Sequence, residues 1–441
     1  MVQSASTAFV SGAWSKATAG ERKSVLLTLA SLIDEHVEEL ALFESIDVGK
    51  PISNALNIDI PGASDTIRGA AEGLDKLYSL TAVDGAGPNL MCQVRKPVGV
   101  VAAIVGWNFP LVLAVSKVAP ALAMGNSVVL KPSEFSPLSA CRLAELATQA
   151  GIPDGVLNVV NGNGAVVGEA LAMHNDVALL SFTGSTATGK QLMISAGRSN
   201  MKRLMLECGG KSPFIVFDDC PPNLDFVAAT AVADAFQNQG QVCGAGTRLL
   251  VHESIYDALI PKVIEQAREL VPADPLLAET TFGPLIHQQQ KAKVQGFIAR
   301  AMEEGVELLL GGKTTIDDKE GCFIAPTIFG NVNPESELAQ EEIFGPVLSI
   351  FKFSDEVEAV ALANNSQFGL QASVMTQSLG RYQRLVHSLD VGLVMVYGSS
   401  SIGAGCISPG IEPHKQSGFG VEQGLAGLAS YSISSSALSM V

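Results

Sequence analysis

The sequence predicts an α/β protein with a doubly wound parallel sheet in one domain, a second α/β domain and a small β arm. Two stretches, 99–182 and 214–396, alternate apolar runs of strand length with helical stretches. Continuous Val/Ile/Leu strands separated by helices are typical of a parallel sheet covered on both faces. Segments 79–97 and 422–441 lie outside these two stretches and do not show the same alternation. We therefore expect a first domain from 1–78 and 98–209, a second from 210–421, and an arm from 79–97 and 422–441.

The first elements are expected to be helices. Thr18 and Glu21 have capping-box spacing, and Gly49 followed by Pro51 marks the end of one long helix. A second helix is expected after Pro61. The apolar side chains at helical spacing in these two segments are Leu26, Leu29, Ile33, Val37, Leu40, Ile67, Leu74 and Leu77.

The two alternating stretches supply the sheets. The first stretch is expected to hold strands at 99–105, 126–132, 156–160 and 177–182. Between them we expect one helix that ends near residue 124 and two more at 138–150 and 165–173. The run 204–210 joins it to the second. There the expected strands are 214–217, 247–251, 346–351 and 392–396, and the expected helices lie near 222–238, 253–269, 287–304 and 378–389. Ligands of such sheets bind at the carboxyl ends of the strands.

The expected arm consists of a hairpin at 79–97 and an alternating tail that reads as an edge strand. Neither segment buries itself, and an unpaired edge seeks a partner. We therefore expect a homodimer or homotetramer.

Composition excludes several classes of protein. Of the 441 residues, 47% are hydrophobic and only 16% are charged, which is opposite to the pattern of a disordered chain. The net charge of −16 argues against nucleic acid and against anionic membranes as partners. The charge-free run 97–116 is interrupted by glycine, asparagine and proline, so we expect a strand, a loop and a helix start there, and no membrane span.

The cysteines and histidines favour a reducing compartment and no metal. Seven cysteines are scattered without a CxxC pair, and six histidines are equally dispersed. The amino-terminal residues lack the basic start and apolar core of a secretory signal. We therefore expect a cytoplasmic protein without a metal site.

Cys243 is the candidate nucleophile. It lies in the sequence QGQVCGAG, where glycines and glutamines are poor core formers but suit a loop that exposes a thiol and its backbone N–H. A thiolate attacks carbonyl carbon well. The alternative is a small buried hydrophobic side chain, which is the usual fate of a lone cysteine.

Glu207 and Asn108 are candidates for the base and the oxyanion donor. Glu207 closes an apolar strand before two glycines, where it is either an ion-paired strand end or a general base with a raised pKa. Asn108 in GWNFP is either a turn residue or an amide donor at the carboxyl end of a strand.

Three loops are candidates for binding a dinucleotide. Lys131 and Glu134 follow a strand, where they read either as a solvated turn or as a pair holding ribose hydroxyls, and a carboxylate there favours NAD over NADP. Gly184 and Ser185 open a helix that is a ready anion site, so we assign them to the pyrophosphate. The glycines 162, 164 and 168 are assigned to the adenosine side.

Together these segments resemble the NAD(P)-dependent aldehyde dehydrogenase superfamily. The matching motifs are WNFP (107–110), KPSE (131–134), FTGST (182–186), ECGG (207–210), GQVCGAGTR (240–248), EEIFGPV (341–347), ANNSQFGL (363–370) and KQSGFG (415–420). The motifs DIPGA (59–63), LNVVNG (157–162) and SNMKR (199–203) are most similar to the branch that includes gamma-glutamyl-gamma-aminobutyraldehyde dehydrogenase.

The resemblance implies a mechanism and a set of site residues. Cys243 would attack the aldehyde, Asn108 and the Cys243 N–H would hold the oxyanion, hydride would pass to NAD, and Glu207 would activate the water that hydrolyses the thioester. Lys117 would support the interior of the site. The implied cofactor contacts are Ile104, Gly106, Trp107, Lys131, Ser133, Glu134, Gly164, Gly184, Ser185, Glu342 and Phe344.

The sequence also departs from the family pattern. Ser116 and Gly244 stand where relatives often have larger residues, which predicts a wide tunnel and a bulky or extended aldehyde. Tyr397 replaces a usual asparagine, and the loop 398–414, with Cys406 as a second candidate thiol, replaces a usual run. Relatives usually have a longer stretch before the first helix, so sheet edges and cofactor affinity are expected to differ.

Two further functions stay open at this point. One is a catalytically silent relative that acts as a binding or assembly protein, although all three catalytic candidates are present. The other is an esterase-type side activity of the same thiol without cofactor.

Overall fold

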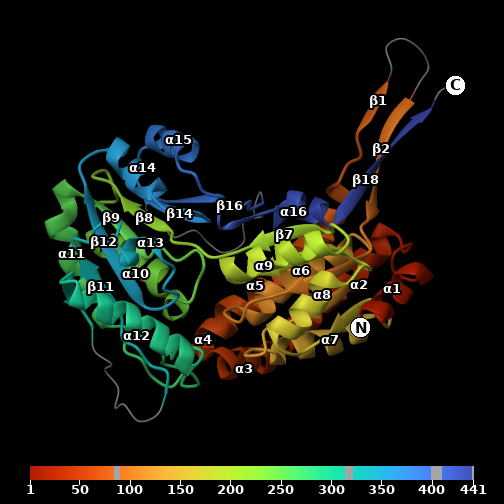
Figure 1. Cartoon of the computed structure of the whole chain (residues 1–441), viewed down its shortest axis with the longest axis horizontal. Helices are drawn as coiled ribbons and strands as arrows, with labels where there is room; N and C mark the ends of the chain where they lie inside the picture. Colours follow the sequence, from red (N-terminus) through yellow and green to blue (C-terminus); the bar gives the residue numbers. More distant parts are fainter. Residues whose placement is uncertain (84–89, 313–320, 399–409, 440–441) are drawn as a thin grey trace.

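The structure is a computed structural model, and it describes residues 1–83, 90–312, 321–398 and 410–439. Two sheet-containing units lie side by side, and a narrow β arm projects from one of them (Figure 1). The fold is α/β, as the sequence predicts. Among the helices that the structure describes, none is long and apolar enough to cross a membrane.

The first sheet has the strand order β17-β7-β6-β3-β4-β5. Its strands are parallel except for the short β17, which pairs antiparallel with β7. The strand bounds are β3 Val100–Ile104, β4 Ser127–Lys131, β5 Leu157–Val159, β6 Val177–Thr183, β7 Arg203–Glu207 and β17 Gly418–Phe419.

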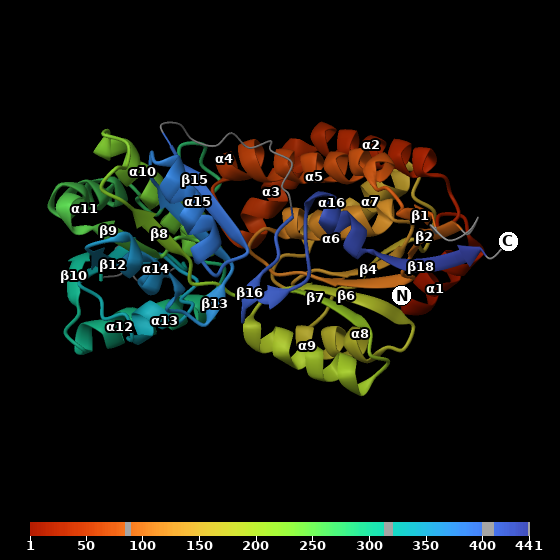
Figure 2. The same ribbon diagram turned by 90° about the horizontal axis from the view of Figure 1, so that it is seen from above.

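Helices cover both faces of this sheet, as a doubly wound fold requires (Figure 2). One face, through Val101 and Val128, packs on α2 Ala19–Glu35, α3 Val37–Val48, α5 Ile60–Gly73, α6 Pro110–Ala123 and α7 Leu138–Ala150. The other, through Val100 and Val129, packs on α1 Val2–Ser11, α8 Glu169–Met173 and α9 Thr186–Arg198.

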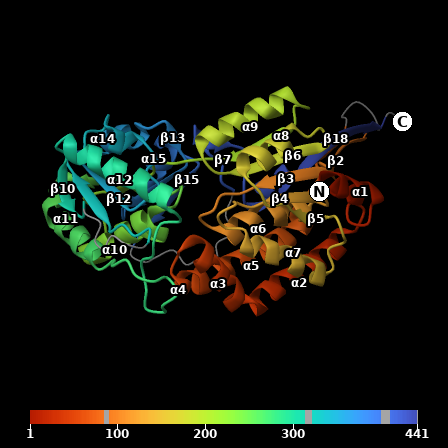
Figure 3. The same ribbon diagram turned by 60° about the horizontal axis from the view of Figure 1, so that its bottom comes forward.

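The second sheet has the order β10-β11-β12-β9-β8-β14-β15 and is parallel except between β10 and β11. Its strands are β8 Pro213–Val216, β9 Arg248–His252, β10 Glu307–Leu310, β11 Thr327–Gly330, β12 Val347–Phe353, β14 Gln371–Met375 and β15 Leu393–Tyr397. Two groups of helices enclose it (Figure 3): α10 Leu224–Phe236 and α11 Glu253–Arg268 on one face, and α12 Gln288–Glu303, α13 Glu337–Gln340, α14 Glu356–Asn364 and α15 Leu379–Ser388 on the other.

The arm is a three-stranded antiparallel sheet in the order β1-β2-β18. It consists of β1 Thr81–Val83, β2 Leu90–Pro97 and β18 Ser432–Ser439, so the expected hairpin and edge strand are confirmed. The remaining elements are α4 Ile52–Asn54, the π-turns Ala55–Asp59 and Gly164–Gly168, the 3-10 turns Leu74–Lys76 and Gln237–Gly240, the paired strands β13 Phe368–Gly369 and β16 His414–Lys415, and α16 Gly424–Ser430.

Several expected elements differ in the structure. The helix expected from Thr18 to Gly49 is two helices, because the backbone leaves helical geometry at His36, whose ring nitrogen lies 2.8 Å from the Leu32 carbonyl oxygen. The capping box of Thr18 and Glu21 is confirmed. Helix α1 and the strands β10, β11 and β14 were not expected. The last of these lies inside the sheet between β8 and β15, yet its sequence QASVM has too few branched residues to stand out.

Candidate active site

Asn108 lies in the loop that joins β3 to α6, at the carboxyl end of the strand. Its side chain is buried, and its Nδ2 donates a hydrogen bond to the carbonyl oxygen of Gln241 at 3.0 Å. In return, Nδ2 of Asn238 donates to the carbonyl oxygen of Asn108 at 3.0 Å. An amide nitrogen carries two hydrogens, so this bond fixes the Asn108 side chain and leaves its second N–H available.

The loop that carries Cys243 has an unusual backbone. Asn238, Gln239 and Gly240 have φ values of 46°, 58° and 71°, in the left-handed region. At Gly240 a Cβ would lie 2.2 Å from the carbonyl oxygen of Gly345, so this position requires glycine. Non-glycine residues in this region cost free energy and are found disproportionately at functional sites. The loop thus presents Cys243 from a conformation that surrounding contacts must hold.

Gln241 supplies several of those contacts. Its Nε2 donates to the carbonyl oxygen of Asn238 at 3.1 Å, and its Oε1 accepts from the N–H of Ile286 at 3.1 Å. Its own carbonyl oxygen holds Asn108. Gln241 therefore links the nucleophile loop to both sides of the site, a role that sequence reasoning missed because glutamine side chains usually face solvent.

Glu207 is the last residue of β7, and its side chain reaches into the protein interior. Its Oε1 is buried and has no hydrogen-bond partner within the described part of the chain. Burial raises the pKa of Glu207 to about 9, the carboxylate of Glu422 pushes it the same way, and Lys117 opposes both. A carboxyl group with this pKa is mostly protonated at neutral pH.

Glu422 belongs to a buried network behind Glu207. It forms an ion pair with Lys117 and accepts a hydrogen bond from Ser181 Oγ at 3.2 Å. The hydroxyl of Tyr431 donates to Ser181 Oγ at 3.0 Å. Lys117 was expected to support the interior, but Glu422 was assigned to the tail and was not singled out.

The structure brings Cys243 next to the Glu207 segment. At Gly210, three residues after Glu207, a Cβ would lie 2.2 Å from the Cys243 carbonyl oxygen. Burial raises the pKa of the half-buried Cys243 thiol to about 12, and the carboxylates of Glu342 and Glu207 add to the increase. The segments that carry Asn108, Glu207 and Cys243 therefore lie against one another.

Ser417, in the KQSGFG motif, connects the segment after Glu207 to the short strand β13 Phe368–Gly369. Its Oγ donates to the Gly209 carbonyl oxygen at 2.7 Å and accepts from the N–H of Gly369 at 3.0 Å. Its carbonyl oxygen accepts from the N–H of Cys208 at 2.8 Å. The strand end that carries Glu207 is thus held from the second unit.

The candidates for the adenosine side gather at the end of β4. The buried Lys131 Nζ lies 3.2 Å from Glu134 Oε2, and the N–H of Gly164 donates to Glu134 Oε1 at 3.3 Å. Burial would raise the pKa of Glu134, but the backbone N–H groups of Glu134 and Gly164 and the charge of Lys131 outweigh it, so the pKa is lowered. Ser133 Oγ accepts from the N–H of Phe135 at 3.2 Å.

The candidates for the pyrophosphate lie at the start of α9. Ser185 caps this helix by accepting from the N–H of Thr188 at 3.2 Å, and the N–H of Gly184 donates to the Glu207 carbonyl oxygen at 3.0 Å. Beside them, Thr183 Oγ1 is buried without a hydrogen-bond partner among the described residues. A helix start beside an unused hydroxyl suits an anion.

Glu342 and Phe344 reach the site from the second unit. Glu342 Oε1 accepts from the N–H of Gly210 at 3.0 Å, and the Phe344 ring stands edge-on to Trp107 with centroids 5.2 Å apart. Phe344 has a φ of 59°, and Gln290 Nε2 donates to its carbonyl oxygen at 2.7 Å. Gln290 was not among the sequence candidates.

The first unit supplies the rest of this group of candidates. Ile104 is buried at the end of β3 under the face covered by α8 and α9. At Gly106 a Cβ would lie 3.4 Å from Asn108 Oδ1, so glycine lets the loop pass close to the amide. The whole set has a carboxylate near each end, Glu134 at one and Glu342 at the other. The start of α9 lies between them, and the rings of Trp107 and Phe344 lie beside the second end. These groups fit a dinucleotide.

The residues expected at the substrate tunnel have the following contacts. At Gly244 a Cβ would lie 2.9 Å from Oε1 of Gln371, so the flexible end of this side chain borders the space at this position. Tyr397 stacks on Phe214 with centroids 5.8 Å apart, and burial raises its pKa to about 12. Ser116 is half-buried and donates to the Leu113 carbonyl oxygen at 2.9 Å. Cys406 lies outside the described residues.

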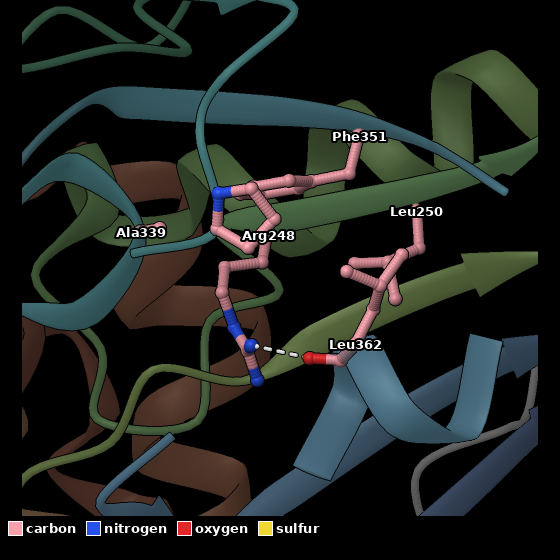
Figure 4. A pocket seen from close by; sticks show the side chains of 6 residues that line it. Arg248, Leu250, Ala339, Phe351 and Leu362 are labelled. Carbon is pink, nitrogen blue, oxygen red and sulfur yellow. Dashed lines mark hydrogen bonds between the residues drawn. The ribbon is translucent and has the colours of Figure 1, made fainter. Parts of the chain in front are cut away.

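The cavity in Figure 4 is not part of this site. It has a volume of about 10 Å³, too little for a substrate, and it is lined by Arg248, Leu250, Pro334, Ala339, Phe351 and Leu362. Arg248 donates to the carbonyl oxygens of Leu362 at 3.0 Å and of Lys211 at 2.8 Å. It therefore braces the segment after Glu207.

The comparisons with known proteins agree with the sequence motifs. A family model described as "Aldehyde dehydrogenase family" matches residues 1–436. The NADP/NAD-dependent aldehyde dehydrogenase PuuC of Escherichia coli (strain K12) is 49% identical over 423 residues, which are 96% of this chain and 84% of that protein.

Solved structures match over the whole fold. An indole-3-acetaldehyde dehydrogenase in complex with NAD+ has a TM-score of 0.96 at 46% identity, covering 100% of this chain and 88% of that one. A gamma-glutamyl-gamma-aminobutyraldehyde dehydrogenase from Burkholderia cenocepacia has a TM-score of 0.94 at 44% identity, covering 99% and 87%. The resemblance to the branch with this last activity is confirmed.

Proposed function

The chain belongs to the aldehyde dehydrogenase family, and we propose that it oxidises a bulky or extended aldehyde with NAD through a thioester on Cys243. The observation that carries this proposal is the hydrogen bond from Asn108 Nδ2 to Gln241, two residues before the thiol. It places an amide donor beside the nucleophile loop, where a carbonyl oxygen becomes negative when sulfur attacks its carbon.

Each residue of the proposed catalytic set has a separate role. The Cys243 thiol releases its proton to solvent as its sulfur attacks the aldehyde carbon, and the second N–H of Asn108 together with the Cys243 N–H stabilises the resulting oxyanion. Bound NAD supplies a hydride acceptor, so that the acyl group remains on Cys243 as a thioester. Glu207, once deprotonated, takes a proton from the water that releases the acid.

The proposed NAD contacts follow the order of the candidates in the structure. Glu134 and Lys131 would hold the adenosine ribose, Gly184 and Ser185 the pyrophosphate, and Glu342 and Phe344 the nicotinamide end. Ile104, Gly106, Trp107, Ser133 and Gly164 complete the proposed contact set. The carboxylate of Glu134 repels a 2′-phosphate, which favours NAD over NADP.

The proposed substrate class rests on Ser116 and on the named relatives. Ser116 is a small, half-buried residue on α6, and a large side chain in its place would narrow the proposed tunnel. The similar structures are those of dehydrogenases named for indole-3-acetaldehyde and for gamma-glutamyl-gamma-aminobutyraldehyde, one bulky and one extended. An aldehyde of either shape is the proposed substrate of this chain.

We further propose the roles of the three parts of the chain. Residues 1–78 and 98–209 bind NAD, residues 210–421 carry the nucleophile, and the arm joins copies of the chain into a homodimer or homotetramer. Exposed apolar side chains support this role of the arm: Leu80, Met91, Val94 and Leu438. They lie on or beside a hollow of about 520 Å³ between β1, β2 and β18.

The experiment is a panel of aldehydes with NAD or NADP, followed by absorbance of the reduced cofactor. It covers indole-3-acetaldehyde, aliphatic and amino-bearing aldehydes, with Cys243→Ala as the control. Turnover that depends on Cys243 and prefers NAD and large aldehydes is expected. No turnover with cofactor bound would point instead to a catalytically silent relative.

A further inference from the structure

A buried ionic cluster lies directly behind the Asn108 loop, and the mechanism above does not use it. Glu44 on α3 and Lys50 after α3 are 0% and 1% exposed, and Asp59 is 5% exposed. Lys50 Nζ lies 3.3 Å from Glu44 Oε2 and 2.5 Å from Asp59 Oδ2. Two carboxylates and one ammonium in an apolar core are costly to desolvate, and apolar residues of similar volume are often no less stabilising. The cluster therefore invites a functional explanation.

Glu44 caps the helix that follows Asn108. Helix α6 begins after Phe109, which has no side-chain acceptor, and its first residue, Pro110, has no N–H. The first N–H that needs a partner is that of Leu111, and it donates to Glu44 Oε1 at 2.9 Å. The same oxygen accepts from Ser139 Oγ at 2.7 Å. A negative charge at a helix start is also favoured by the helix dipole.

Lys50 holds the residue between Asn108 and the helix. Its ammonium lies 4.5 Å from the centre of the Phe109 ring, in cation–π geometry. Asn108 is thus held from both sides. Asn238 and Gln241 contact it from the nucleophile loop, while Lys50 and Glu44 contact the nearby Phe109 and Leu111. An oxyanion donor works only if its position is set before charge develops.

We propose that Glu44 and Lys50 are positioning residues for the Asn108 amide in the oxidation reaction. This inference rests on the proposed function, because it assigns Asn108 the oxyanion role. Glu44 acts through the N–H of Leu111 and touches neither substrate nor cofactor. Its removal should lower kcat more than it changes KM, and only while Asn108 is present.

A double-mutant cycle tests the proposal. Glu44→Asp keeps the charge beside Lys50 but withdraws the oxygen from Leu111, whereas Glu44→Gln keeps an oxygen there and loses the charge. In the wild-type background we expect Glu44→Asp to lower kcat about ten-fold and Glu44→Gln to stay within about three-fold. In the Asn108→Ala background Glu44→Asp should change kcat less than about two-fold.

The matched control lies on the same helix. Asp47, three residues after Glu44, accepts from the N–H of Leu138 at 3.0 Å and so caps α7 instead of α6. Asp47→Ala should lower the melting temperature and leave kcat unchanged. If Glu44→Asp does not fold, Ser139→Ala removes one of the donors to Glu44 Oε1 and should lower kcat about three-fold, again only with Asn108 present.

Two results overturn the proposal. One is a folded Glu44→Asp protein whose kcat equals that of the wild type or falls by the same factor in both backgrounds. The other is a crystal structure of Glu44→Asp in which Asn108 keeps its 3.0 Å contact with Gln241 and its position. A wild-type protein without aldehyde turnover contradicts the proposed function instead, and the crystal structure alone then decides the positioning role.

Discussion

The side-chain amide of Asn108 donates a hydrogen bond to the carbonyl oxygen of Gln241 at 3.0 Å, although 133 residues separate them in the chain. This contact joins the end of β3 in the first sheet to the loop between α10 and β9, which also carries Cys243. It orients one amide N–H and leaves the second without a hydrogen-bond partner among the described residues. The proposed chemistry depends on this arrangement.

Replacing Asn108 by alanine should remove an oxyanion donor while leaving the thiol in place. The expected result is a fall in kcat of about 10²–10³-fold, the usual effect of losing one such donor. KM and the melting temperature should change little by comparison. Asn57→Ala is the control: this exposed asparagine donates to the Ser53 carbonyl oxygen and to no other group in the described part of the chain. A fall of less than about three-fold would assign Asn108 a turn role only.

The pH dependence of turnover should follow Glu207. Its pKa of about 9 means that the deprotonated form, which the mechanism requires, is scarce at neutral pH. The kcat should therefore rise as pH increases through about 9. Glu422→Gln removes a negative neighbour, which lowers the pKa of Glu207 and moves the rise to lower pH. Steady-state kinetics from pH 6 to pH 10, with the exposed Glu72→Gln as control, measure both profiles.

An unchanged profile in Glu422→Gln would mean that Glu422 does not act on the titrating group. A rise that persists at the same pH in Glu207→Gln would assign the titration to another residue.

Glu134 should decide the choice between NAD and NADP. Replacing it by alanine removes charged hydrogen bonds to the ribose that are together worth roughly 1.5–3 kcal/mol, so NAD should bind about 10–100-fold more weakly. NADP should bind no more weakly than before, because the repelling carboxylate is gone. Fluorescence titration with each cofactor measures this, with Glu145→Ala on α7 as control. Equal losses for both cofactors would contradict the assignment.

Ser116 should set the width of the substrate tunnel. Ser116→Trp should lower kcat/KM for indole-3-acetaldehyde at least ten-fold and leave that for a short aliphatic aldehyde within about three-fold. Ser116→Ala, which keeps the space and loses only the hydroxyl, is the matched control. If both aldehydes lose activity equally, the side chain disturbs α6 rather than the tunnel.

The order of strands and helices could be predicted where the apolar runs are long. The strands near 99–105, 126–132 and 177–182 were found because they are continuous Val/Ile/Leu segments buried on both faces. Strand β14 was missed because its composition does not indicate a buried strand. It is buried because neighbouring strands lie on both sides of it in the sheet. The break at His36, where the backbone leaves helical geometry, is not revealed by the spacing of the apolar residues alone.

The candidate site was predictable as a set of residues but not as an arrangement. Cys243, Glu207 and Asn108 stand out because polar or reactive groups end strands or sit in glycine-rich loops. Glu44 was missed because it lies far from these motifs in the chain. Glu422 lies close to the KQSGFG motif, but its contacts with Lys117 and Ser181 join distant segments and cannot be read from the sequence. The contact of Gly244 with Gln371 could not be predicted, because Gln371 lies in β14, far along the chain.

Mass spectrometry of the Glu207→Gln variant, mixed with NAD and a substrate aldehyde, tests the central claim most directly. Without the base that activates water, an acyl group should accumulate on Cys243, seen as a mass increase equal to the aldehyde less two hydrogens. Wild-type protein under the same conditions should show little adduct. Formation of NADH without any adduct, or an adduct on a different cysteine, would contradict the proposed mechanism.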